Sequence, residues 1–234
     1  MKIALLGYGR MGKAIEEIAL NRGHQIVYRL DKDLEEGHLK WADVAINFSV
    51  PNAAVINIKA AFECSVPVVC GTTGWLDQQA EINTLCQAKK TAFLYASNFS
   101  VGVHLFFKLA RFMAQLMIPH SADYKAQLTE IHHIHKLDAP SGTAITLAEN
   151  VIDNSSYTQW TKTNPKENEL LINSLREGEV PGTHTLSYHS EIDAINITHE
   201  AYNRKGFAMG AVVAAEWIKG KTGIFTMDDV LNLS

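Results

Sequence analysis

The sequence predicts an α/β protein in which a domain built on a parallel sheet is joined to a second, mixed α+β domain. Short apolar strands alternate with helical segments up to about residue 100, as is typical of βαβ units. Segments with an apolar residue at every second position appear later, at 183–190 and 194–201, as half-buried strands require. A final apolar helix and strand indicate a return to the first domain. We therefore expect residues 1–100 with 205–234 to form one domain and residues 101–204 the other.

The elements of the first domain follow from this alternation. Strands are expected at 3–6, 25–30, 44–48, 66–70 and 92–96, because each is a short apolar run that ends in turn residues. Helical spacing predicts a helix after the first strand, through Leu20, and another at 53–63. The tail is expected to add a helix at 207–218 and a closing strand and helix within 220–233.

The second domain is less regular. An apolar helix is expected at 101–118, with its aromatic side chains in the core. A strand at 128–136 is followed by a helix that Ser141 can cap. Residues 153–179 are polar and predict a loop or partly mobile excursion, with only a short helix at 166–175. The remaining strands suggest an antiparallel sheet whose flat face is available for subunit contact.

Composition excludes several classes of protein. The 234 residues are 47% hydrophobic, which is enough for a substantial core. The net charge of −4 provides no positive electrostatic potential that would attract nucleic acid. Three cysteines without a Cys-x-x-Cys pair suit reduced thiols. The apolar run at 3–6 is too short for a signal peptide or a membrane span. We expect a cytoplasmic protein that binds neither nucleic acid nor membranes.

The first strand leads into the pattern G-x-G-x-x-G of a Rossmann-type dinucleotide site. Gly7 permits the tight turn, Gly9 lets the backbone approach a pyrophosphate, and Gly12 lets the helix lie close to the strand. Asp31 ends the second strand at about the spacing of the acid that binds the adenosine ribose. Asp31 favours NAD, whereas the cations Lys32 and Arg10 could accept a 2′-phosphate, so either NADH or NADPH suits the site. The alternative is a glycine turn that binds nothing.

Two further loops follow the carboxyl ends of predicted strands, the edge at which open α/β sheets bind ligands. One contains Gly71 and Thr72, and the other contains Ser97 and Asn98. We expect them to meet the nicotinamide half of the cofactor. The residues of each loop are equally well explained by the backbone preference of such turns for glycine, threonine and asparagine.

The segment from Glu130 to Ala144 has the highest density of chemically active side chains. His132, His133 and His135 can exchange protons near neutral pH, and Lys136 adds a positive charge. The helix that follows Ser141 begins with backbone N–H groups that can bind an anion. This combination predicts a pocket for a small carboxylated or phosphorylated substrate that is protonated during the reaction. A histidine-rich surface strand is the alternative.

Over nearly its whole length the chain resembles the 4-hydroxy-tetrahydrodipicolinate (dihydrodipicolinate) reductases of lysine and diaminopimelate biosynthesis. The most specific match is segment 130–144, and the others are the loop 7–12, Phe48-Ser49 with Pro51, the stretches 71–74, 98–100 and 176–178, and the tail from Arg204. The resemblance implies a Rossmann domain, a mixed αβ domain whose sheet builds a homotetramer, and hydride transfer from NADH or NADPH to a cyclic imine dicarboxylate.

The resemblance also implies roles for individual residues. His132 would be the general acid/base and Lys136 a proton donor, without a metal. Substrate contacts would come from His133, Lys136, Gly142 and Thr143, with Arg204 assisting. The cofactor would be held by Gly7, Tyr8, Gly9, Arg10, Met11, Gly12, Asp31, Lys32, Gly71, Thr72, Thr73, Ala96, Ser97, Asn98 and Phe99.

Three rival functions remain open from the sequence. A metal-dependent hydrolase would use His132, His133 and His135 as zinc ligands, but adjacent histidines on a strand point to opposite faces, and no glutamate or cysteine is spaced to complete the set. A nucleotide-binding sensor would bind NADH without consuming it. The histidine–lysine cluster would then have no function. A different imine or amino-acid dehydrogenase is the third.

Overall fold

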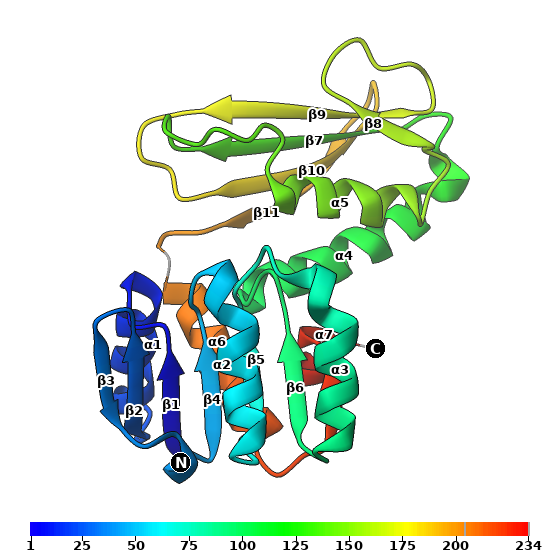
Figure 1. Ribbon diagram of the computed structural model, residues 1–234. Coiled ribbons are helices and arrows are strands. Elements are labelled where there is room, and N and C mark those ends of the chain that lie inside the picture. Colours follow the sequence, from blue (N-terminus) through cyan, green and yellow to red (C-terminus); the bar gives the residue numbers. More distant parts are fainter. Residues whose placement is uncertain (204, 234) are drawn as a thin grey trace. The chain divides into compact units, whose positions relative to one another are not determined.

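A computed structural model describes residues 1–203 and 205–233 (Figure 1). The chain divides into two compact units, Met1–Val101 with Lys205–Ser234, and Gly102–Arg204. The first unit has a largely parallel sheet with helices on both faces, and the second has a mixed sheet. The fold class predicted from the sequence is therefore confirmed.

The first unit holds a seven-stranded sheet in the order β12-β6-β5-β4-β1-β2-β3. All neighbouring strands are parallel except β2 and β3. Because β2 and β4 flank β1, the chain reverses direction across the sheet at β1, the position at which such folds bind ligands. The strands are β1 (Lys2–Leu6), β2 (Gln25–Asp31), β3 (Leu34–Gly37), β4 (Val44–Asn47), β5 (Val68–Cys70), β6 (Ala92–Tyr95) and β12 (Gly223–Phe225).

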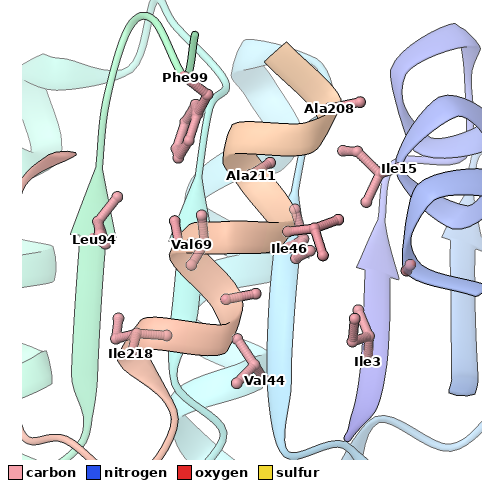
Figure 2. Close-up of a cluster of buried hydrophobic side chains, with 14 of the residues drawn as sticks. Ile3, Ile15, Val44, Ile46, Val69, Leu94, Phe99, Ala208, Ala211 and Ile218 are labelled. Carbon is pink, nitrogen blue, oxygen red and sulfur yellow. The ribbon is translucent and has the colours of Figure 1, made fainter. Parts of the chain in front are cut away.

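Helices cover both faces of this sheet, because alternate residues of each buried strand point to opposite sides. Ile3 and Leu5 of β1 enter one apolar cluster, whereas Ala4 and Leu6 enter the other. The first cluster packs under α1 and α6, and Figure 2 shows α6 lying across the side chains of β4, β5 and β6. The helices are α1 (Arg10–Asn21), α2 (Pro51–Glu63), α3 (Gln79–Ala88), α6 (Lys205–Ile218) and α7 (Met227–Leu231).

Strand β3 was missing from the sequence prediction. Its four residues, Leu34–Gly37, are mostly exposed and acidic, so they carry no apolar alternation. They nevertheless form an antiparallel edge strand, because the tight turn after Asp31 brings them back against β2. Charged residues are usual on such an edge, where they discourage pairing with another chain.

The second unit holds a five-stranded sheet in the order β11-β10-β7-β9-β8. Helices α4 (Val101–Met117) and α5 (Gly142–Ile152) pack on one of its faces, over a core that includes Leu128, Leu147, Ile172 and Leu186. The strands are β7 (Lys125–His132), β8 (Gln159–Thr161), β9 (Glu169–Arg176), β10 (Thr183–His189) and β11 (Ala194–Glu200).

The predicted short helix at 166–175 is wrong, since these residues contribute most of strand β9. Leu170 and Ile172 are buried at alternate positions, which is a strand pattern that the surrounding polar residues obscured. The prediction of an antiparallel sheet is also only partly right. Strand β10 is antiparallel to β7 and β11, but β9 is parallel to β7 and β8. The chain returns through α5 between β7 and β8, and through the segment 162–168 between β8 and β9.

The prediction that the aromatics of α4 lie in the core is wrong for Phe112, which is 59% exposed, although Phe106 is buried. Leu109 and Leu116 lie near Phe112 at helical spacing and are also more than half exposed. By length and composition, residues Val101–His120 could cross a membrane, with a mean hydropathy of 1.4. This is weak support for a span, because core helices of globular proteins meet the same criterion.

Candidate active site

The glycine turn after β1 has the geometry that the sequence predicted. Gly7 has φ +102°, and a Cβ there would stand 2.2 Å from the carbonyl oxygen of Phe48. A Cβ on Gly12 would stand 2.3 Å from the carbonyl oxygen of Gly7. A Cβ on Gly9 would meet no described atom within 4 Å. Gly7 and Gly12 therefore permit close backbone packing, whereas the space beside Gly9 is open to a ligand.

Asp31 is fixed beside this turn by backbone donors. Its Oδ2 accepts the N–H of Tyr8 at 3.0 Å, and its Oδ1 accepts the N–H of Lys32 at 2.8 Å. A cavity of about 400 Å³ opens at this point, lined by Tyr8, Lys13, Asp31, Lys32, Asp33 and Leu34. The structure thus brings Tyr8, Asp31 and Lys32 together at one cavity.

An ion pair that the sequence did not reveal lies next to this cavity. Arg29 of β2 pairs with Glu16 of α1, and its guanidinium stands 5.6 Å from the centre of the Tyr8 ring. The hydrogen bond from Arg29 holds the pKa of Glu16 below its usual range, although burial opposes this shift. Only the register of α1 on β2 places the two residues together, so no local pattern could have predicted the pair.

The loops after β5 and β6 meet around Phe48. A Cβ on Gly71 would stand 2.2 Å from the Phe48 ring, and the ring of Phe99 lies 5.5 Å away. Thr72 is buried, and its Oγ1 accepts the N–H of Ser49 at 2.9 Å. Three of the predicted cofactor residues, Gly71, Thr72 and Phe99, thus also shape this sheet edge.

The other residues of these loops are more open. Asn98 accepts the N–H of Ser100 at 2.8 Å through its side chain, which stabilises the turn before α4. Thr73 and Ser97 are exposed, and Ala96 is buried. Arg10 is exposed and Met11 is half-buried at the start of α1.

His132 is the last residue of β7 and is buried. Glu130, two residues earlier and therefore on the same face of the strand, is fully buried. Its Oε2 lies 3.1 Å from His132 Nδ1. The β7–β10 register places Glu130 opposite His184, and the β7–β9 register places His132 opposite Arg176. Together they form a buried charged cluster.

Burial alone would raise the pKa of Glu130, but the His132 imidazole, 3.1 Å away, and the hydrogen bond from Ser141 hold it well below its usual range. Burial lowers the pKa of His184 to about 4, and repulsion from His132 adds to that effect. At neutral pH the cluster therefore contains an ionised Glu130 and an uncharged His184. His184 was missed by the sequence analysis, because only the strand register brings it to Glu130.

The expectation that no glutamate is spaced to complete a metal ligand set is wrong, because Glu130 lies beside two histidines. Glu130, His132 and His184 each place a ligand atom within 4.8 Å of the others. The carboxylate is already engaged, since Oε1 accepts the N–H of Ser141 at 3.0 Å and lies 3.3 Å from Arg176 Nη2. An arginine in the cluster opposes a divalent cation by charge, so an ion-pair network accounts for the arrangement.

The predicted strand at 128–136 is too long, because the chain turns after His132. Ile134 donates its N–H to Gly178 O, and Lys136 donates to His133 O. The Lys136 ammonium lies 2.8 Å from Asp138 Oδ1. His133 is half-buried, whereas His135 is exposed beside Glu179. The turn therefore leaves His133 and His135, whose ring centres lie 6.2 Å apart, outside the buried cluster around His132.

Ser141 caps α5 as predicted. Its Oγ accepts the N–H of Ala144 at 3.2 Å and also lies 3.2 Å from His184 Nε2. Gly142 is exposed, and a Cβ there would meet no described atom within 4 Å. Thr143 is half-buried in the first turn. Arg204, the remaining predicted substrate contact, lies outside the described residues.

Comparisons with known proteins agree along the whole chain. Residues 1–99 match the family profile described as "Dihydrodipicolinate reductase, N-terminus", and residues 102–231 match "Dihydrodipicolinate reductase, C-terminus". A 4-hydroxy-tetrahydrodipicolinate reductase from Christiangramia forsetii is 54% identical over 235 residues, covering 99% of this chain and 98% of the relative. Another from Archaeoglobus fulgidus is 35% identical over 265 residues, covering 99% and 100%.

A solved structure shares the fold. It is a dipicolinate-bound dihydrodipicolinate reductase from Paenisporosarcina sp. TG-14, which superimposes with a TM-score of 0.80 at 23% identity and covers 97% of each chain.

Proposed function

The chain belongs to the dihydrodipicolinate reductase family and catalyses the NAD(P)H-dependent reduction of 4-hydroxy-tetrahydrodipicolinate to tetrahydrodipicolinate in lysine and diaminopimelate biosynthesis, and from this premise we propose how its residues perform the reaction. The first unit binds the cofactor, and the second binds the substrate and supplies the proton. The observation that carries the assignment is the buried His132 at the end of β7, next to a fully buried carboxylate.

The residues of the first unit fit a nicotinamide dinucleotide. The open space beside Gly9 and the start of α1, which no side chain caps, suit the pyrophosphate. Asp31 accepts hydrogen bonds from the adenosine ribose, with Lys32 and Arg10 as the nearby cations. Loops 71–73 and 96–99 contact the nicotinamide end. When bound, NAD(P)H supplies the hydride.

The second unit binds a small dicarboxylate. The first turn of α5 offers backbone N–H groups at Gly142 and Thr143 to one carboxylate, and the open space beside Gly142 permits its close approach. His133 and Lys136 add charge-assisted hydrogen bonds, and Arg204 assists them. The dipicolinate carried by the Paenisporosarcina enzyme is a ligand of this chemical class.

His132 and Lys136 supply the proton. Hydride addition leaves an electron pair on the atom that accepts it, and this atom takes a proton from a positioned acid. His132 is held rigidly by its burial on β7, whereas Lys136 lies on the turn that follows and is paired with Asp138. His132 therefore acts as the general acid/base, and Lys136 donates a proton and orients the substrate.

The test is oxidation of NADH and of NADPH in the presence of product freshly made by dihydrodipicolinate synthase. We expect His132→Ala to lower kcat on the order of 10²- to 10⁴-fold, as loss of a general acid does. Lys136→Ala should lower kcat and raise KM. His135→Ala is the matched control, because this exposed histidine lies in the same segment. A wild-type rate in His132→Ala would contradict the assignment.

We also propose that the open face of the second sheet joins copies of the chain into a homotetramer. α4 and α5 pack on the other face, and the open face carries a cross-strand contact between Thr185 and Thr198, whose hydroxyl oxygens lie 3.0 Å apart. Thr185→Glu would place a charge inside such an interface. Light scattering should report a tetramer for the wild type and a smaller species for this variant, with Thr84→Glu at an exposed position of α3 in the first unit as the matched control.

The chain is further proposed to act in the cytoplasm. Cys64, Cys70 and Cys86 are all free thiols, as a reducing compartment favours. Fractionation of cells that produce the protein should recover it with cytoplasmic markers, and recovery in the membrane fraction would contradict this proposal.

A further inference from the structure

Glu130 is a fully buried carboxylate that the reaction described above does not use. Transfer of an ionised carboxylate into a protein interior is costly unless charges and hydrogen-bond donors compensate it. Its two oxygens have different partners. Oε1 accepts the N–H of Ser141 at 3.0 Å and lies 3.3 Å from Arg176 Nη2, whereas Oε2 lies 3.1 Å from His132 Nδ1. One oxygen thus anchors the side chain, and the other is turned towards the imidazole.

Arg176 connects this carboxylate to the turn that carries Lys136. Its Nη2 donates to Asp138 O at 2.5 Å, and its Nε donates to Lys136 O at 3.3 Å. The guanidinium is therefore shared between Glu130 and the backbone of 136–138. Movement of Glu130 away from His132 would require this whole set of contacts to rearrange.

Residue 182, a glycine, lies at the other edge of the His132 ring. A Cβ on Gly182 would stand 3.0 Å from His132 Nε2, which is tighter than almost all real Cβ contacts. With Nδ1 facing the carboxylate at 3.1 Å, Nε2 is the ring nitrogen left to exchange a proton. His184 packs edge-on against the ring at 5.1 Å. Because burial lowers the pKa of His184 to about 4, this residue presents no positive charge to Glu130 at neutral pH.

We infer that Glu130 is a positioning residue: its carboxylate accepts the Nδ1–H of His132, which fixes the ring orientation and the tautomer, so that Nε2 is the atom that exchanges the proton in the reaction. This inference rests on the proposed role of His132. Arg176 and the N–H of Ser141 hold Glu130 in place. The arrangement follows the general pattern in which a second group orients a catalytic histidine.

The first test observes the tautomer directly and needs no activity. In protein labelled with ¹⁵N-histidine, long-range ¹H–¹⁵N spectra distinguish a protonated Nδ1 from a protonated Nε2, and the His132 signals are assigned by their loss in His132→Ala. We expect the neutral ring in the wild type to carry its proton on Nδ1. A proton on Nε2 would overturn the inference, whether or not any Glu130 variant folds.

The second test uses Glu130→Gln, whose side-chain amide can donate to Nδ1 and so favours the Nε2–H tautomer. We expect kcat to fall on the order of 10- to 10³-fold, while KM and the Kd for NADH change less than about threefold. Circular dichroism and the melting temperature check that the variant is folded. In the His132→Ala background the same substitution should have no further effect on kcat, because Glu130 acts through His132.

These outcomes separate the inference from the proposed function. If His132→Ala retains the wild-type kcat, the proposed function fails. If His132→Ala is impaired but Glu130→Gln lowers kcat by the same factor in both backgrounds, Glu130 acts independently and the inference fails. Glu179→Gln is the matched control, since it removes an exposed carboxylate 3.5 Å from His135 Nε2 and should leave kcat unchanged.

Discussion

Gly210 of α6 lies directly against the backbone of Phe99: a Cβ on Gly210 would stand 1.7 Å from the Phe99 carbonyl oxygen. Phe99 ends the loop that we assign to the nicotinamide end of the cofactor site, and Figure 2 shows its ring near the start of α6. A helix from the end of the chain thus supports a cofactor loop that lies over a hundred residues earlier in the sequence. This contact explains why the tail belongs to the first unit.

Gly210→Ala should displace the loop that contains Phe99. The added methyl group has no room, so we expect the free energy of unfolding to fall by about 1–3 kcal/mol, and the Kd for NADH to rise. Urea denaturation and NADH fluorescence measure the two effects. Gly206→Ala in the same helix is the control, because among the described residues its Cβ would meet only Ser100 Oγ, at 3.7 Å. Alanine favours a helix more than glycine does, so propensity alone would stabilise both variants, and equal effects of the two substitutions would show that this contact is not responsible.

Asp31→Ser should shift cofactor preference towards NADPH. The Asp31 carboxylate is fixed by the N–H groups of Tyr8 and Lys32, so its charge cannot move away from a 2′-phosphate. Removal of the charge should raise the ratio of NADPH affinity to NADH affinity on the order of tenfold, about 1.4 kcal/mol. Fluorescence titration with both cofactors measures this ratio. Asp33→Ser removes a charge from the same cavity. An equal shift in that variant would mean that the overall electrostatic potential of the cavity, and not the position of Asp31, sets the cofactor preference.

The sequence predicted those parts of the fold and site that depend on local pattern. Gly7, Gly9 and Gly12 could be assigned because a strand, three glycines and a helix follow one another without interruption. The Ser141 cap could be assigned for the same reason. The prediction for β9 failed because its residues lie between polar turns, and pairing with β7 decides their conformation.

The charged cluster around His132 depends on strand register and could only be found in part. Glu130 is visible in the sequence, two residues before His132, because alternate residues of a strand share a face. His184 comes from β10 and Arg176 from β9. No local sequence pattern shows how these strands align with β7. Long-range pairing therefore accounts for what the sequence analysis missed here.

Ser141→Ala should destabilise the second unit through the loss of the helix cap. The hydroxyl accepts the N–H of Ala144 and contacts His184, so we expect a loss of about 1 kcal/mol in the free energy of unfolding, measured by urea denaturation. Ser141→Thr should retain most of the stability. Ser141→Asp, an equally good cap elsewhere, should be at least as harmful as alanine, because it would place a second carboxylate beside the buried Glu130. A stable aspartate variant would contradict this account of the cluster.

His184 should make the protein less stable as the pH falls below about 6.5. Burial, with repulsion from His132, lowers the pKa of His184 to about 4 from the ordinary value of 6.5, while Glu130 opposes the shift. Between these two pH values the unfolded chain binds a proton at this residue that the folded chain does not, so the unfolded state gains stability as the pH falls. The contribution is complete above pH 6.5 and is lost by about pH 4, and it amounts to roughly 3 kcal/mol.

Urea denaturation at a series of pH values from 7.5 to about 5 measures this contribution, above the range in which carboxyl groups titrate in the unfolded chain. His184→Gln retains a hydrogen-bond acceptor for Ser141 but cannot be protonated. The variant should therefore show a shallower decline in stability over this range than the wild type. Some decline should remain, because burial also lowers the pKa of His199. Identical slopes for the wild type and His184→Gln would mean that His184 accepts a proton in the folded protein as readily as in the unfolded chain, and that the cluster tolerates a positive charge on His184.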